Sequence, residues 1–140
     1  MTGANESSGP MPEMVLPPAP STSVFCTLRF EATHDWPGAE GITAFLGSSH
    51  RHMFHIRATV PVQHDDRDVE FIRMKGEIRE LLDQRFGREG SLPDMGATSC
   101  EMLGRYIALY LLAIYGAAAW AEVEVSEDGE NGATVLEVRG

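Results

Sequence analysis

The sequence predicts an α+β fold, in which an antiparallel sheet of four strands carries a pair of helices on one face. Two segments with period-two alternation come first, two with helical periodicity follow, and two more alternating segments close the chain. Residues 128–132 between the last two strands favour a turn, because Asp, Asn and Gly tolerate positive φ. The order ββααββ places the helix pair between the second and third strands.

The length of 140 residues fits one domain. Residues 1–22 are rich in Gly, Pro, Ser and Met and lack apolar periodicity, so we expect a disordered N-terminal tail. Residues 23–140 are then expected to form a single domain.

The first predicted hairpin has strands at 24–34 and 50–62. Alternation places the even-numbered residues from Cys26 to His34 on one face of the first strand. The loop at 35–49 contains three glycines and a proline, and it is long enough to shape the mouth of a pocket.

The helix pair is predicted from apolar residues that recur every three or four positions. One helix covers 69–86, a glycine-rich loop follows at 87–96, and the second helix begins near Thr98 or Ser99. The remaining strands are predicted at 119–127 and 133–138.

Composition excludes several classes of function. The net charge is -10, from 11 basic and 21 acidic residues, and this argues against general nucleic-acid binding. No apolar run reaches the ~20 residues of a membrane span, and the N-terminus lacks the features of a secretory signal. The two cysteines indicate no disulfide framework, so a reduced cytoplasm is the expected location.

Three histidines form the most informative pattern in the chain. His50 and His52 lie two residues apart on a strand, so both side chains point to one face, about 6.5–7 Å apart. In an antiparallel hairpin, His34 at the end of the first strand lies beside them. Three imidazoles with one open position are a ligand set for catalytic Zn²⁺. Ordinary strand histidines are the alternative.

Five short motifs, in order, resemble those of the 6-pyruvoyl- and 6-carboxy-tetrahydropterin synthases, which have the tunnelling fold. The match extends from Phe25 to Val138, and its motifs carry the following residues: Phe30-Glu31-Ala32-Thr33-His34 for F-x-A-x-H, His50-Arg51-His52 for H-G-H, Val69-Glu70-Phe71 with Met74-Lys75 for V-x-D-F-x-x-L-K, Ser99-Cys100-Glu101 for T-x-E, and Val123 to Glu127 for the strand that ends in E-T.

The resemblance implies a function and a set of site residues. Members bind zinc through histidines that correspond to His34, His50 and His52. They hold the pterin ring with a glutamate that corresponds to Glu127, and a carboxylate suits the two parallel N–H donors of such a ring. They act on dihydroneopterin triphosphate. They assemble as stacked trimers with the active sites between subunits, so the resemblance implies a homo-oligomeric barrel, a trimer or a hexamer.

Two departures from the family affect proton transfer. The family's catalytic cysteine, four residues before the first histidine of H-G-H, corresponds to Leu46. Its Asp-His relay after the first helix corresponds to Asp83 and Gln84. Neither leucine nor glutamine can act as a general acid or base, so Asp83 is the remaining candidate.

Several residues have two interpretations. Glu101 either completes a capping box with Thr98 or joins Ser99 and Glu127 in binding the base. Cys100 is either a core thiol or a thiolate favoured by its place at the start of a helix. Asp35 is either an exposed acid or a partner that orients an imidazole. His55 points away from His50 and His52 and is not expected to bind the metal.

These observations predict a zinc-dependent carbon–oxygen lyase of the tetrahydropterin synthase type, acting on a pterin or 7-deazaguanine precursor such as those of queuosine synthesis. The alternative is a zinc-containing protein that binds a pterin or a purine without conventional turnover. A plain α+β scaffold with incidental histidines is the third possibility.

Overall fold

The computed structural model describes residues 22–140. The predicted tail therefore lies almost wholly outside the described residues. The described elements are β2 (Ser23–His34), η1 (Gly41–Gly47), β3 (His50–Pro61), α1 (Phe71–Phe86), α2 (Cys100–Ile114), β4 (Trp120–Glu127) and β5 (Asn131–Val138). Within this part of the chain, none of the helices is long and apolar enough to cross a membrane.

The four strands form one antiparallel sheet, as the sequence predicts, and the structure gives their order in it as β2-β3-β4-β5. His34 lies directly opposite His50, and Ala32 opposite His52. The next pairing places Phe54 on β3 opposite Glu127 on β4. The register therefore brings the end of β2, the start of β3 and the end of β4 to one end of the sheet.

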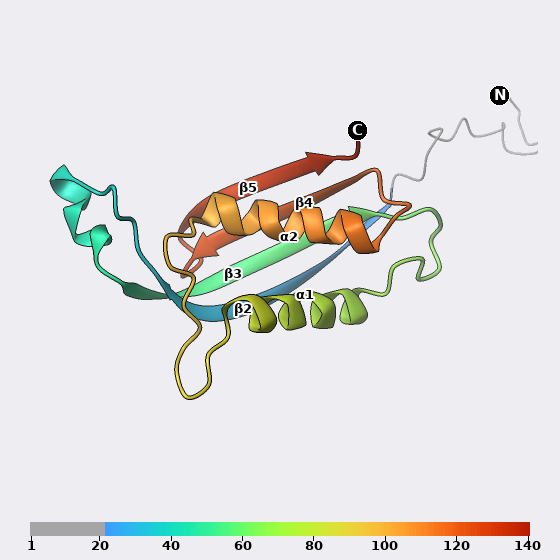
Figure 1. Ribbon diagram of the computed structural model, residues 1–140. Coiled ribbons are helices and arrows are strands. Elements are labelled where there is room, and N and C mark those ends of the chain that lie inside the picture. Colours follow the sequence, from blue (N-terminus) through green and yellow to red (C-terminus); the bar gives the residue numbers. More distant parts are fainter. Residues whose placement is uncertain (1–21) are drawn as a thin grey trace, which may run out of the picture.

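Both helices cover the same face of the sheet (Figure 1). The even-numbered residues of β2 from Cys26 to His34 are buried on that face, which confirms the predicted alternation. Gly104 lets α2 pack closely, because a Cβ there would lie 3.0 Å from Cγ2 of Val135. This packing removes one face of the sheet from water and leaves the other open.

Two details of the helices differ from the prediction. Helix α1 begins at Phe71, two residues later than expected, because the Glu70 carboxylate caps it by accepting from Ile72 N and Arg73 N. Helix α2 is capped by Ser99, whose Oγ accepts from Met102 N at 3.1 Å. The cap is therefore at Ser99, one residue beyond the Thr98 of the predicted capping box.

The loop after β2 contains the short 3₁₀ helix η1, which the sequence analysis did not predict. Figure 1 shows it standing away from the sheet, beyond the end of β2. A hydrogen bond from Trp36 N to Leu46 O of 2.8 Å joins the two ends of the loop. Ile42 and Phe45 in η1 are 95% and 72% exposed, so this segment packs little apolar surface against the rest of the described chain.

Candidate metal centre

The three predicted histidines meet at one end of the sheet. His34, His50 and His52 each offer a ring nitrogen, and these atoms all lie within 4.8 Å of one another. The rings meet edge to face, with centroids 4.6 Å apart for His34 and His50 and 5.0 Å for His50 and His52. Phe54 is fully buried beneath them, with its ring 5.0 Å from that of His34. The predicted convergence of the three imidazoles is confirmed.

Each imidazole is held by an acceptor at Nδ1. His34 Nδ1 lies 2.9 Å from Thr98 O, and His50 Nδ1 lies 2.8 Å from Ser48 O. His52 Nδ1 lies 2.7 Å from Oδ2 of Asp128. Because carbonyl and carboxylate oxygens only accept, each Nδ1 carries the proton, and in the neutral ring Nε2 keeps its lone pair.

Each Nε2 atom therefore keeps a lone pair that can bind a metal ion. Among the described residues, the Nε2 atoms of His34 and His52 are buried and have no hydrogen-bond partner. Oxygen atoms of Glu127 lie 3.2 Å and 3.5 Å from these two nitrogens, but the orientation forms no hydrogen bond. The nitrogen lone pairs and the negative carboxylate repel each other. A cation bound between them replaces this repulsion with attraction. The three imidazole nitrogens thus fit Zn²⁺, which binds neutral imidazole nitrogen.

Asp128 orients His52 and was not singled out from the sequence. Its backbone has φ of 57°, a left-handed conformation that Asp tolerates better than most residues. Its Oδ1 accepts from Met53 N at 3.0 Å, while its own N donates to Met53 O at 2.7 Å. Two hydrogen bonds lower the pKa of Asp128, and the one from Met53 N has a larger effect than the one from His52. The turn after β4 is therefore fixed to β3, and its carboxylate is charged at neutral pH.

A cavity of about 500 Å³ opens beside the histidines, and His34 and His50 form part of its wall. The three residues expected to bind the base, Ser99, Glu101 and Glu127, all line it. Gly132 forms another part of the wall, and any side chain there would collide with Val125 O, since an added Cβ would lie 1.9 Å from it. The size suits a small ligand.

Leu46 lines the same cavity, at the position of the cysteine in the family pattern. Cys100 also lines it, but burial, and next the charges of Glu127 and Glu101, raise the pKa of its thiol to about 12. At neutral pH this side chain is a thiol, which agrees with the core interpretation. Asp35 lies at the cavity wall, but none of the three histidine Nδ1 atoms uses it as a partner.

Asp83 lies away from this cavity, although the sequence suggests it as a proton-transfer group. It lines a shallow groove on α1 with Gly76, Arg79, Glu80 and Gln84. Gln84 donates to Glu80 within the same helix, with an Nε2–Oε2 distance of 3.3 Å. Within one chain, Asp83 is therefore not brought to the histidines.

Solved structures of 6-pyruvoyl tetrahydropterin synthase resemble this chain. The enzyme from Plasmodium vivax is 14% identical, with a TM-score of 0.54, and the match covers 84% of this chain and 99% of that one. The Plasmodium falciparum enzyme is 17% identical over the same shares, with a TM-score of 0.51. A P. vivax variant altered at a catalytic residue is 16% identical, also over these shares, with a TM-score of 0.53.

No protein-family model matches the chain, and the comparison with curated proteins gives no match either. At such low identity, the structural likeness shows the fold. The α+β tunnelling fold that the motifs predict is thereby confirmed.

Proposed function

We propose that this protein binds one Zn²⁺ through His34, His50 and His52 and holds a pterin or guanine-like base in the adjacent cavity. The observation that carries the proposal is the convergence of three imidazoles whose Nδ1 atoms are all engaged. Three histidines leave a coordination position free for a ligand. When bound, zinc supplies Lewis acidity toward a hydroxyl or carbonyl oxygen of the substrate side chain.

Glu127 is the proposed recognition residue for the base. Its side chain is 31% exposed at the cavity wall, so one carboxylate can accept two parallel N–H bonds from a 2-amino-4-oxo ring edge. The hydroxyl of Ser99 already accepts from Met102 N, and its own proton remains available to a ligand. Glu101 is exposed near Ser99, and its carboxylate can accept another hydrogen bond from the ligand.

The proposed reaction class is that of a carbon–oxygen lyase acting on dihydroneopterin triphosphate or a related 7-deazaguanine precursor. The composition of the cavity favours a second candidate, which is base binding without conventional turnover. Leu46 cannot move a proton, Cys100 holds its proton at neutral pH, and Asp83 is remote within the chain. Asp83 can contribute only to a site completed by a neighbouring copy.

We also propose a homo-oligomer, a trimer or a hexamer, that closes through the sheet edges. Strands β2 and β5 are the two edges. Exposed apolar side chains lie along them: Phe25 is 47% exposed, Leu136 is 56% and Val138 is 62%. An open edge with apolar side chains favours pairing with another copy, and a heterologous contact that closes gives a ring. A monomeric mass at micromolar concentration would contradict this assembly.

The test of function measures metal, ligand and product on the same preparation. We expect one zinc per chain, a bound pterin or guanine-like base by mass spectrometry, and little product from dihydroneopterin triphosphate. Turnover at ordinary enzyme rates would favour the lyase over the binding protein. A chain that neither contains nor takes up zinc would overturn the proposed centre.

A further inference from the structure

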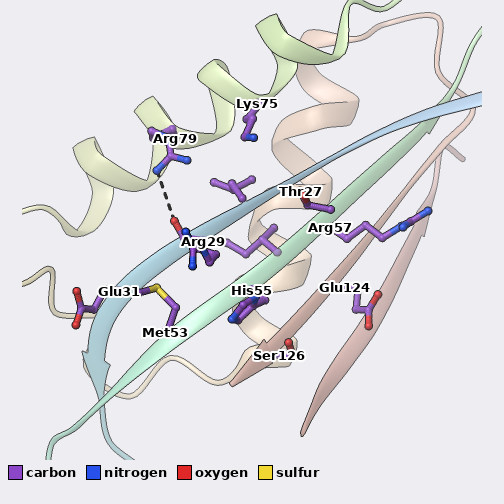
Figure 2. Close-up of a pocket in the computed structure, with 12 residues that line it drawn as sticks. Thr27, Arg29, Glu31, Met53, His55, Arg57, Lys75, Arg79, Glu124 and Ser126 are labelled. Atoms are coloured by element: carbon purple, nitrogen blue, oxygen red, sulfur yellow. Dashed lines mark hydrogen bonds between the residues drawn. The ribbon is translucent and has the colours of Figure 1, made fainter. Parts of the chain in front are cut away.

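A second hollow, of about 840 Å³, lies beside the edge strand β2 and is lined by residues of the open face of the sheet and by Lys75 and Arg79 of α1. Its strand residues Arg29, His55 and Arg57 are odd-numbered, whereas the metal-binding histidines are even-numbered, so the two sets point to opposite faces. Figure 2 shows Lys75 and Arg79 of α1 beside strand β2, which carries Arg29. The side chain of Arg79 lies 3.5 Å from Arg29 O at that edge.

The hollow gathers positive charge in an acidic protein. Four of its lining residues are Arg29, Arg57, Lys75 and Arg79, in a chain of net charge -10. Within residues 22–140, none of these four has a carboxylate oxygen within 4.0 Å, whereas each of Arg51, Arg67, Arg73 and Arg105 has one. Four cations that come together without ion pairs repel one another, and a bound anion removes that repulsion.

The two acids of the hollow, Glu31 and Glu124, offset only part of this charge. Glu31 forms an ion pair with Arg51 at 2.6 Å, so its charge is already matched by another residue. Glu124 lies opposite Arg57 in the strand register, and Arg57 stacks over the ring of Phe25 at 3.7 Å from its centroid. The side of the hollow next to α1, with Arg29, Lys75 and Arg79, therefore carries the unmatched positive charge.

We propose that this hollow binds a short oligophosphate anion. Guanidinium groups form bidentate hydrogen bonds with phosphate oxygens, and the lysine adds a point charge. The hydroxyls of Thr27 and Ser126 on the same wall are further donors. A long polyanion is disfavoured, because beyond the hollow it meets the acidic surface of the protein. The site is independent of the metal centre, since no residue lines both cavities.

The test is calorimetric titration of the full chain with inorganic triphosphate at low salt. We expect saturable binding that weakens as salt rises. The Arg29→Gln/Arg79→Gln variant should lose roughly a hundredfold in affinity, about tenfold for each cation. The matched control is Arg67→Gln/Arg73→Gln, which removes the same charge from side chains that are 82% and 79% exposed outside the hollow. We expect the control to stay within about twofold.

Lys75→Gln is a second, single-site variant in case the double variant does not fold, and we expect roughly a tenfold loss from it. Equal losses in the control and hollow variants, or no binding by the wild type at millimolar triphosphate, would overturn the proposal. Tighter binding of an oligothymidylate than of triphosphate would replace it with a nucleic-acid surface. Zinc content should be the same in all variants, which separates this result from a failure of the proposed metal centre.

Discussion

The three histidines at one end of the sheet are brought together and held by hydrogen bonds, whereas the positions expected to transfer protons lie apart from one another. All three imidazoles have an Nδ1 partner, and these partners come from three separate segments: the loop before α2, the end of the η1 loop and the turn after β4. The proton-transfer positions are instead scattered. Leu46 lines the cavity, whereas Asp83 and Gln84 lie in a separate groove on α1.

The contrast separates binding from catalysis. Holding ring orientations by three independent hydrogen bonds reduces the entropy that a metal site must lose on binding. Proton transfer needs a titratable group within hydrogen-bond reach of the substrate, and a leucine gives none. The described residues therefore bring together three imidazoles that could hold a metal, whereas Asp83 and Gln84 do not meet them within one chain.

The largest expected effect comes from breaking the histidine end itself. His52→Ala should abolish stoichiometric zinc binding, because two imidazoles hold the ion weakly. His55→Ala is the matched control, since His55 lies on the same strand and points to the opposite face. Metal analysis after dialysis measures both variants. Full zinc content in His52→Ala would show that the ion is held elsewhere.

Replacing the recognition carboxylate should have the next largest effect. Glu127→Gln places an amide donor against ring N–H donors and should cost about 1.5–3 kcal/mol of base-binding free energy. Zinc should be retained, because the three histidines are unchanged. Glu124→Gln is the control, on the same strand but on the opposite face of the sheet. Fluorescence titration with a pterin measures the loss, and equal affinities for wild type and Glu127→Gln would contradict the assigned role.

Asp128→Asn should weaken zinc binding by about tenfold, the lower end of the range for partners that orient a metal ligand. Asn tolerates the positive φ but has a single acceptor oxygen, so it cannot accept from both Met53 N and His52 Nδ1 as the two carboxylate oxygens of Asp128 do. Chelator competition measures affinity, and ¹⁵N shifts of His52 report its tautomer. Glu130→Gln, in the same turn, is the control. If Asp128→Asn binds zinc as the wild type does, the carboxylate charge has no part in holding the metal.

Much of the fold was predictable, because hydrophobic periods of two and of three to four residues are local signals. The burial of alternate residues from Cys26 to His34 follows from them, as does the pairing of His34 with His50. Element ends were less predictable. Ser99 rather than Thr98 caps α2, and two neighbouring residues that can both cap are difficult to distinguish by pattern.

Contacts between distant segments could not be read from the sequence. The sequence suggests Asp35 as a partner for an imidazole because it follows His34, yet Asp128 takes that role for His52 across 76 positions of sequence separation. The only signal for Asp128 was its place in a turn that favours positive φ. The pocket roles of Ser99, Glu101 and Glu127 and the proton-transfer role of Asp83 stay predictions, although the first three line one cavity.

The smallest effect is expected at Cys100, which tests whether this cavity contains a hidden base. Its folded pKa of about 12 lies above the ordinary value of 9.0 because burial disfavours the thiolate, and the charges of Glu127 and Glu101 add to this. The folded state therefore keeps a proton that the unfolded chain releases, and stability should fall as pH rises from about 9 towards 12.

At pH 8 we expect a thiol reagent to leave Cys100 unmodified until the chain is unfolded, and Cys100→Ala to bind the base within about twofold of wild type. Cys26→Ser isolates this signal, since Cys26 is the other cysteine and its burial raises its pKa to about 11. Rapid modification of Cys100 at pH 8 would reveal a thiolate in the cavity, and Cys100 would then replace Asp83 as the candidate base.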